Sequence, residues 1–175
     1  MDKVEANIYL LRHGEKNKDG TALSKNGISQ ASYLAKRLKD IKFNKIYSSD
    51  LVRCKQTAEI ISKNHPIKII FDESLREVEG KVKEFPEKYF KEIKIIKSFW
   101  NKVTKEKGNI LVVASGNFNR VLIAIAMGIN PSILRFAQTP TGLTHFEFIN
   151  KNKTRIEYVN DTSHLPKKLR KRQAY

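Results

Sequence analysis

The sequence predicts an α/β domain whose central sheet is mostly parallel and carries an antiparallel edge. Apolar runs alternate along the chain with amphipathic stretches, which is typical of strands that alternate with helices. The first four apolar runs are short and contain few polar residues, as expected of buried parallel strands. The last two runs alternate between apolar and polar residues, and the polar sequence NKNKT separates them. This pair therefore predicts an antiparallel hairpin at one edge of the sheet.

The elements follow from the spacing of the apolar residues. Apolar runs predict strands over Ile8–Leu11, Lys45–Ser48, Ile67–Ile70, Ile110–Ala114, Leu143–Ile149 and Arg155–Val159. Apolar residues three and four positions apart predict helices over Gly27–Asp40, Asp50–Lys63, Glu84–Lys107 and Phe118–Met127. The range Glu84–Lys107 fits either one long helix or two, with Pro86 in the first turn.

Length and composition favour one cytoplasmic domain. The 175 residues predict a single domain over residues 1–166 and a basic tail over residues 167–175, which begins with KKLRKR. No apolar run approaches the ~18 residues of a membrane span, so no membrane partner is expected. The N-terminus does not resemble a signal peptide, and the single cysteine, Cys54, excludes an internal disulfide framework. Together these features favour the cytoplasm.

The net charge of +16 has two interpretations. It indicates either affinity for polyanions or lysine-rich helix faces that are simply solvated. We favour solvated faces for most of these charges. Nucleic acid is not an expected partner, because KKLRKR lacks interleaved aromatic residues that would stack on bases. The sequence contains no signal for either a monomer or an oligomer.

A reactive group of residues follows the first predicted strand. Arg12, His13 and Gly14 come directly after Ile8–Leu11, and ligands of parallel α/β sheets bind beyond the carboxyl ends of the strands. Gly14 would allow a ligand to approach the backbone closely. A histidine at a strand end often has no role beyond the loop, so the interpretation depends on what lies at the neighbouring strand ends.

Two further strand-to-helix junctions carry groups that suit an anion. Arg53 lies in the first turn of the helix after IYSSD, and a helix N-terminus favours anions. Arg120 follows SGN after the fourth strand, where backbone N–H groups can face an oxyanion. Arg12, Arg53 and the Ser115–Asn117 turn could therefore converge on one phosphate group, which two guanidinium groups match well.

A histidine among these arginines suits phosphoryl transfer. Cationic neighbours lower the pKa of an imidazole, so His13 would stay neutral at pH 7 and act as a nucleophile toward phosphorus. The arginines would neutralise the charge of the transferring group in the transition state.

Six motifs together resemble those of the histidine phosphatase superfamily. In chain order they are LLRHGEKN, ALSKNGISQA, IYSSDLVRCKQTAEII, LREVEG, VVASGNFNRVLIAIAMGI and VNDTSHL. The resemblance covers nearly the whole chain and implies the phosphoglycerate mutase-like fold, a three-layer α/β/α sandwich. It implies that His13 becomes the phosphohistidine, that Arg12 and Arg53 bind the phosphate, and that Glu77 protonates the leaving group. Glu79 is a second candidate for this acid.

The chain departs from the family pattern at one position. Where the family has a second histidine, in a Ser-His-Gly-Gly-like turn, this chain has Ser115. The Ser115 hydroxyl and the amides of Gly116 and Asn117 could still donate hydrogen bonds to the phosphoryl oxygens, but without charge. Losing one such donor costs about 3–4 kcal/mol, a hundred- to a thousandfold in rate. The resemblance also suggests that Asn17 donates to the phosphate and that His164 lies near the site.

The sequence thus predicts a phosphatase that hydrolyses phosphomonoesters and needs no metal or other cofactor, since no residues have metal-ligand spacing. A short helical insert over residues 79–107 implies an open pocket, suited to a phosphorylated small molecule or a phosphoprotein. Lys16, Lys18, Lys81 and Lys83 would form a basic rim that attracts acidic substrates. Two alternatives stay open: a phosphoglycerate mutase, and a catalytically impaired pseudoenzyme that binds phosphate or phosphoproteins.

Overall fold

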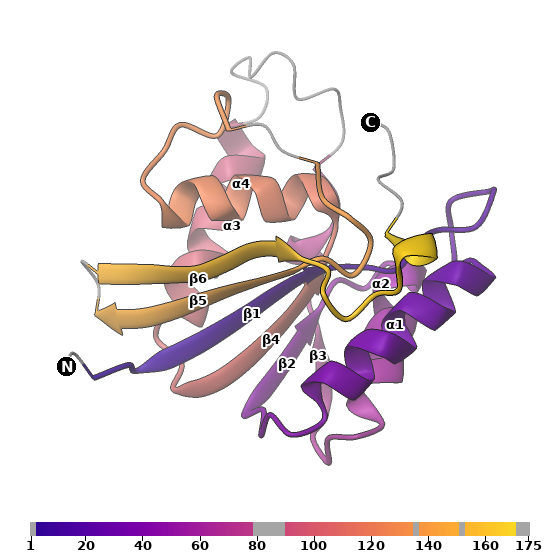
Figure 1. The fold of residues 1–175 in the computed structure, drawn as a ribbon. Helices are drawn as coiled ribbons and strands as arrows, with labels where there is room; N and C mark the ends of the chain where they lie inside the picture. Colours follow the sequence, from indigo (N-terminus) through magenta and orange to yellow (C-terminus); the bar gives the residue numbers. More distant parts are fainter. Residues whose placement is uncertain (1–2, 79–89, 135–136, 151–152, 171–175) are drawn as a thin grey trace.

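The computed structural model describes residues 3–78, 90–134, 137–150 and 153–170. These residues form a six-stranded sheet with the strand order β3-β2-β4-β1-β5-β6 (Figure 1). The strands are β1 (Ala6–Arg12), β2 (Lys45–Ser48), β3 (Ile69–Phe71), β4 (Gly108–Ala114), β5 (Leu143–Asn150) and β6 (Lys153–Asp161). Strands β1 to β4 are parallel, and β5 pairs antiparallel with both β1 and β6. The predicted parallel sheet with an antiparallel edge is confirmed.

Helices cover both faces of the sheet, so the predicted three layers are also confirmed. Helices α1 (Lys25–Leu38) and α2 (Val52–Ser62) pack on one face, and α3 (Phe90–Val103) and α4 (Gly116–Ala126) pack on the other (Figure 1). Each face has its own apolar core, because β1 and β4 send alternate side chains to opposite sides. The start of the predicted helix Glu84–Lys107 lies outside the described residues.

One predicted strand differs from its expected environment. The third strand was expected over Ile67–Ile70 as a buried strand, but β3 covers Ile69–Phe71 at the edge of the sheet. Ile70 and Phe71 are therefore 39% and 45% exposed. A short edge strand has no neighbour on its outer side, which an apolar run alone does not reveal.

The described beginning of the basic tail contacts the domain. Lys167–Leu169 forms a 3₁₀-helix in which Leu169 is buried. The Leu169 carbonyl accepts a hydrogen bond of 2.9 Å from the Gln30 side chain of α1. The boundary at residue 166 stays a prediction, and residues 171–175 lie outside the described part of the chain.

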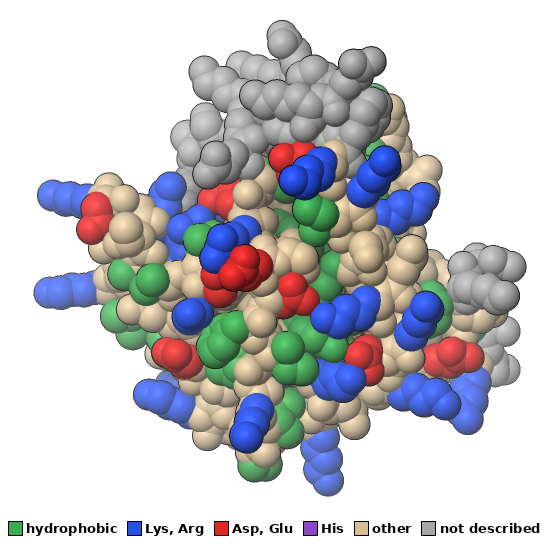
Figure 2. All heavy atoms as spheres, turned by 180° about the vertical axis from the view of Figure 1, so that it is seen from behind, with side chains coloured by type: hydrophobic (Ala, Val, Ile, Leu, Met, Phe, Trp, Pro, Cys, Tyr) green, Lys and Arg blue, Asp and Glu red, His purple; other side chains and the backbone are tan. Residues whose placement is uncertain are grey.

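The surface shows how the charge is arranged. On the face in Figure 2, Lys and Arg side chains are spread among acidic and apolar ones instead of gathering in one patch. None of the helices in the described ranges is long and apolar enough to span a bilayer.

The register of the sheet brings three strand ends together. Arg12 of β1 pairs with Ala114 of β4, and Ser48 of β2 pairs with Val113 one residue earlier. The segments that follow these strands therefore begin side by side at one edge of the sheet, as expected for a doubly covered parallel sheet.

Candidate active site

His13 follows β1 and is almost fully buried, with 2% of its surface exposed. Its backbone N–H donates to the Ala114 carbonyl of β4 over 3.0 Å. Its ring nitrogen Nδ1 lies 2.7 Å from the Gly14 carbonyl, which can only accept, so Nδ1 carries the proton. The other ring nitrogen, Nε2, accepts a hydrogen bond of 3.1 Å from Arg53 Nε. The lone pair of the neutral ring is therefore on Nε2.

Burial is the main reason that this ring stays neutral. It lowers the pKa of His13 to about 3, and the charges of Arg12, Arg53 and Lys16 lower it further, against the opposing effect of the Gly14 carbonyl. The sequence predicts this neutrality, but it attributes the lowered pKa to the cations alone. The desolvation of the strand end is visible only in the fold.

Arg53 connects the nucleophile with the candidate acid. It is the second residue of α2, and its guanidinium donates to three groups in different directions. Nε contacts His13, Nη1 donates to the Gly20 carbonyl over 3.3 Å, and Nη2 lies 2.6 Å from Glu77 Oε2. The structure thus brings His13, Arg53 and Glu77 together, although Arg53 is 40 residues from His13 in the chain and Glu77 is 24 residues from Arg53.

Arg12 lies against the start of α4. Its side chain is buried, and Nη1 donates to the Gln138 carbonyl. A Cβ atom at Gly116 would lie 3.4 Å from Arg12 Nε, so the guanidinium packs directly against the first residue of the helix. The positive charge of Arg12 therefore lies beside the N-terminus of α4, which itself favours anions.

Ser115 is the N-cap residue of α4 and is fully buried. Its hydroxyl makes no hydrogen bond with any group in the described parts of the chain, and the first turn of α4 contains no acidic residue. A buried hydroxyl without a partner is costly unless a ligand or water satisfies it. Beside Arg12 and a helix N-terminus, this donor is suited to an anion.

Glu77 lies in the segment that follows the 3₁₀-helix Glu73–Leu75. Its side chain is 37% exposed, so it is open to solvent on one side while it contacts Arg53 on the other. Asn117 holds this segment, because its Nδ2 donates to the Val78 carbonyl over 3.2 Å. The predicted contact of the Asn117 backbone amide with phosphate stays a prediction, while the Asn117 side chain positions the segment of Glu77. Glu79 lies outside the described residues.

The remaining predicted residues have mixed placements. Asn17 Oδ1 accepts from the Ala22 N–H over 3.2 Å and so closes the loop after His13; its predicted contact with phosphate stays a prediction. Lys16 and Lys18 are exposed on this loop, whereas Lys81 and Lys83 lie outside the described residues. Arg120 lies just over one turn into α4, away from its first turn.

Two site residues were missed by sequence reasoning. The Thr57 hydroxyl of α2 accepts from the Gly14 N–H over 3.1 Å and donates to the Arg53 carbonyl over 2.8 Å. Gln30 of α1 accepts from the Glu15 N–H over 2.8 Å. Both side chains are fully buried. Their signal in the sequence was a polar residue on the apolar face of each predicted helix.

A family model and several known proteins match this chain. The family model of the histidine phosphatase superfamily (branch 1) matches residues 8–105 and 94–162. A probable 2-carboxy-D-arabinitol-1-phosphatase of Arabidopsis thaliana is 29% identical over 182 residues, covering 81% of this chain and 38% of that protein. A probable phosphoglycerate mutase, GpmB, of Escherichia coli is 39% identical over 80 residues, covering 41% of this chain and 37% of that protein. The chain thus spans less than two fifths of the length of these relatives.

Solved structures share the fold over nearly the whole chain. A mutant phosphoserine phosphatase from Entamoeba histolytica, in complex with phosphoserine, superposes with a TM-score of 0.75 at 25% identity and covers 92% of this chain and 100% of that one. A phosphoglycerate mutase from Bacillus anthracis gives a TM-score of 0.74 at 22% identity, with 93% and 96% covered, which shows the likeness of fold. Because the family model matches well over half of the chain, this protein belongs to the histidine phosphatase superfamily.

Proposed function

We propose that this protein is a phosphatase that hydrolyses phosphomonoesters through a phosphohistidine on His13. One observation carries the proposal. His13 is buried and neutral, its Nδ1 proton is fixed by Gly14, and its Nε2 lone pair faces the Arg53 guanidinium at 3.1 Å. A phosphate that binds the Arg53 guanidinium would replace the hydrogen bond from Arg53 Nε to His13 Nε2, which frees the lone pair for attack on phosphorus.

The first step would form the bond from His13 Nε2 to phosphorus and break the bond from phosphorus to the ester oxygen. The departing oxygen would take a proton from the carboxyl group of Glu77. Phosphate oxygens would compete for the Arg53 nitrogen that contacts Glu77, so the carboxylate would leave the ion pair and take up a proton from solvent before this transfer. In the second step water would attack phosphorus, the bond to Nε2 would break, and Glu77 would accept the proton of water.

The phosphoryl oxygens would be held by charge and by hydrogen bonds. Arg12 and Arg53 would neutralise them, and the Ser115 hydroxyl with the amides of Gly116 and Asn117 would donate from the start of α4. The buried Ser115 hydroxyl supports this assignment, because a phosphoryl oxygen would satisfy it. A serine donates without a positive charge, so we expect slower turnover than a second histidine would allow.

The substrate class follows from the site and from the relatives. The names of the relatives refer to phosphatases and mutases of small phosphorylated compounds, among them 2-carboxy-D-arabinitol 1-phosphate and phosphoglycerate. Glu77 is partly exposed and Lys16 is exposed beside the nucleophile, which is compatible with an open, positively charged entrance. We therefore propose phosphorylated small molecules as substrates.

Ser115 favours a second candidate function, a phosphate-binding protein with little or no turnover. The anion-binding groups would remain in such a protein, whereas the charge of the second histidine is missing. The two functions predict different rates but similar affinity for phosphate.

The test is hydrolysis of p-nitrophenyl phosphate in the presence of EDTA by the parent and by the variants His13→Ala and Ser115→His. A matched control is His145→Ala, which removes a half-buried histidine from β5. We expect turnover by the parent and by the control, with an acid-labile phosphoryl adduct on both, and neither turnover nor adduct with His13→Ala. Full activity of His13→Ala would show that His13 is not the nucleophile. An inactive parent that binds phosphate and gains turnover with Ser115→His would identify the binding protein.

A further inference from the structure

The loop over residues 137–142 supports both residues that begin the site. The Gln138 carbonyl accepts from the side chain of Arg12. The Thr141 N–H lies 3.0 Å from the Arg12 carbonyl and 3.3 Å from the His13 carbonyl, and the Arg12 N–H donates to the Gly142 carbonyl over 3.4 Å. This loop therefore contacts the backbone of Arg12 and His13 on one side, while β4 contacts it on the other.

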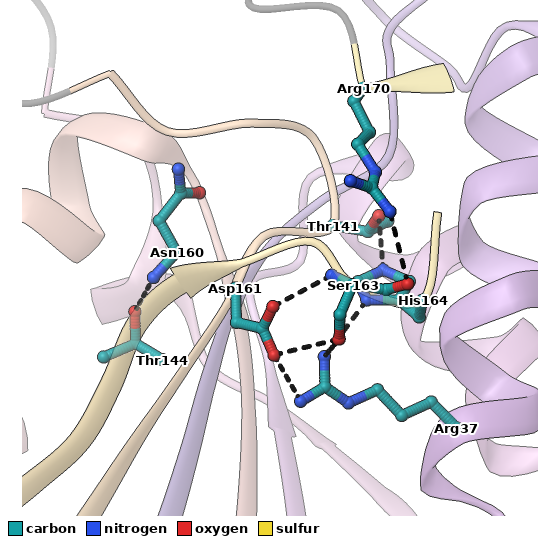
Figure 3. Close-up of polar contacts among 8 residues, drawn as sticks. All are labelled: Arg37, Thr141, Thr144, Asn160, Asp161, Ser163, His164 and Arg170. Atoms are coloured by element: carbon teal, nitrogen blue, oxygen red, sulfur yellow. Dashed lines mark hydrogen bonds and ion pairs between the residues drawn. The ribbon is translucent and has the colours of Figure 1, made fainter. Parts of the chain in front are cut away.

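The loop is in turn held by the end of β6. Asn160 Oδ1 accepts from the Thr139 N–H over 2.9 Å, and Asn160 Nδ2 donates to the Ala137 carbonyl over 3.1 Å. The backbone N–H of Asn160 donates to the Thr144 hydroxyl over 3.1 Å (Figure 3). Asn160 has a φ of 53°, a conformation that asparagine tolerates better than most residues.

His164 contacts the same loop at Thr141. Its Nδ1 lies 3.4 Å from Arg37 Nη1, and its Nε2 lies 3.3 Å from the Thr141 hydroxyl (Figure 3). Arginine only donates, so Nδ1 of the neutral ring accepts and Nε2–H donates to Thr141. Arg37 is itself fixed by an ion pair of 2.6 Å with Asp161 and a hydrogen bond of 3.1 Å to the Ser163 hydroxyl.

Thr141 is a residue that needs such support. It is fully buried and has a φ of 59°, which is unfavourable for a β-branched side chain. Strained conformations persist where the surroundings determine them, and they gather at functional sites. His164 contacts the hydroxyl of Thr141, and the backbone N–H of Thr141 contacts the carbonyls of both Arg12 and His13.

A second contact joins the C-terminal segment to the loop after His13. The buried Gln30 side chain donates to the Leu169 carbonyl over 2.9 Å and accepts from the Glu15 N–H over 2.8 Å. The segment 160–169 is thus connected at two points to residues 12–15, which we call the nucleophile loop. One connection runs through Thr141 to Arg12 and His13, and the other runs through Gln30 to Glu15.

We propose that the segment 160–169 is a buttress of the nucleophile loop and that His164 is a positioning residue, which holds His13 in its attacking geometry through Thr141. This inference rests on the proposed function, since it assigns His164 a role toward the same nucleophile. His164 does not touch the reacting groups in this arrangement, so its effect appears in the rate of the chemical step and not in the binding of phosphate.

The experiment compares His164→Leu, His164→Gln, Thr141→Val and the double variant His164→Leu/Thr141→Val. Glutamine retains an oxygen to accept from Arg37 and an amide N–H to donate to Thr141, whereas leucine retains neither. Valine keeps the branched shape at position 141 and removes only the hydroxyl. His145→Gln is the control, because His145 is also half-buried and contacts Asn7 instead of the loop.

We expect His164→Leu to lower kcat for p-nitrophenyl phosphate roughly tenfold with KM nearly unchanged, because small displacements of a reacting group are costly. His164→Gln should restore most of kcat, and the double variant should be no slower than the slower single variant, since both remove the same contact. Equal losses with Gln and Leu, additive losses in the double variant, or a loss of thermal stability without any change in kcat would overturn the proposal.

A measurement on the ring of His13 separates this proposal from the proposed function. We expect the ¹⁵N signals of the His13 ring to shift or double in His164→Leu and Thr141→Val, and to stay unchanged in His145→Gln. If the parent has no turnover, the phosphatase proposal fails, and these signals still test the buttress. Unchanged His13 signals in both variants would overturn the buttress, even where the parent is an active phosphatase.

Discussion

The ring of His13 is held by two contacts that decide which nitrogen can react. The Gly14 carbonyl takes the Nδ1 proton, and Arg53 donates to Nε2. Neither partner can reverse its role, because a carbonyl has no proton to give and a guanidinium has no lone pair to offer. The tautomer therefore follows from the backbone geometry after β1 and from the position of Arg53 at the start of α2.

This arrangement predicts a specific protonation state of His13. In ¹⁵N NMR spectra of the histidine rings, we expect His13 to stay neutral, with the proton on Nδ1, from pH 7.5 to pH 5. Its pKa is lowered to about 3, mainly by burial, so it should protonate only in strong acid. The unfolded protein in urea is the control, where the same ring should titrate near the ordinary value of about 6.5. A folded-state pKa near 6.5, or a proton on Nε2, would contradict the geometry.

At the scale of elements, the loop after β1 and the helix α1 approach each other through two glycines. A Cβ atom at Gly27 would lie 2.1 Å from the Glu15 carbonyl oxygen, and one at Gly14 would lie 2.6 Å from the Gly27 carbonyl oxygen. Both clashes involve backbone atoms, which cannot rotate away. Ser24, the N-cap of α1, accepts from the Gly27 N–H over 3.0 Å and donates to Glu15 over 2.7 Å, which fastens the same contact.

Gly27→Ala is therefore expected to destabilise the protein and to slow turnover. Alanine is favoured over glycine in a helix by about 1 kcal/mol, whereas overpacking against rigid neighbours costs about 1–3 kcal/mol, and the backbone clash should win. The measurements are urea unfolding and kcat. Ser29→Ala, on the exposed face of α1, is the control and should change neither. A Gly27→Ala variant more stable than the parent would show that the helix and the loop can move apart without cost.

At the scale of the whole molecule, all four histidines have lowered pKa values in the folded state, with burial as the largest cause. The pKa falls to about 3 for His13 and to about 4 for His164, and it is lowered for His65 and His145 as well. In the unfolded chain these rings take up protons near pH 6.5. Below that pH the unfolded state binds more protons than the folded state, so stability must fall as the pH falls.

We expect the free energy of unfolding in urea to decrease between pH 7.5 and pH 5. His13 and His164 should each contribute about 2 kcal/mol to this decrease. Their folded-state pKa values, about 3 and about 4, both lie below pH 5, so both rings stay neutral in the folded protein across this window. The double variant His13→Gln/His164→Gln should show a shallower dependence on pH over the same window. An equal dependence in the parent and in the double variant would mean that neither ring is held neutral by the fold.

Much of the fold could be predicted because hydrophobic periodicity is a local property. The four parallel strands, the hairpin β5–β6 and the helices α1, α2 and α4 all lie within a few residues of their predicted ranges. The exception, β3, has the composition of a buried strand, and its position at the edge of the sheet depends on where the neighbouring strands lie.

Some features of the site could likewise be predicted from the sequence, and others depend on the tertiary structure. Arg12, His13, Arg53 and Ser115 follow strand ends or begin helices, so the sequence by itself indicated that they meet at one edge of a parallel sheet. The tertiary structure alone decided which nitrogen of His13 carries the proton, that Arg53 also contacts Glu77, and that Asn117 donates to the Val78 carbonyl. It also decided the roles of Thr57, Gln30 and Thr141. Hydrogen-bond partners far apart in the chain are chosen by the packing of the layers, and no local pattern records them.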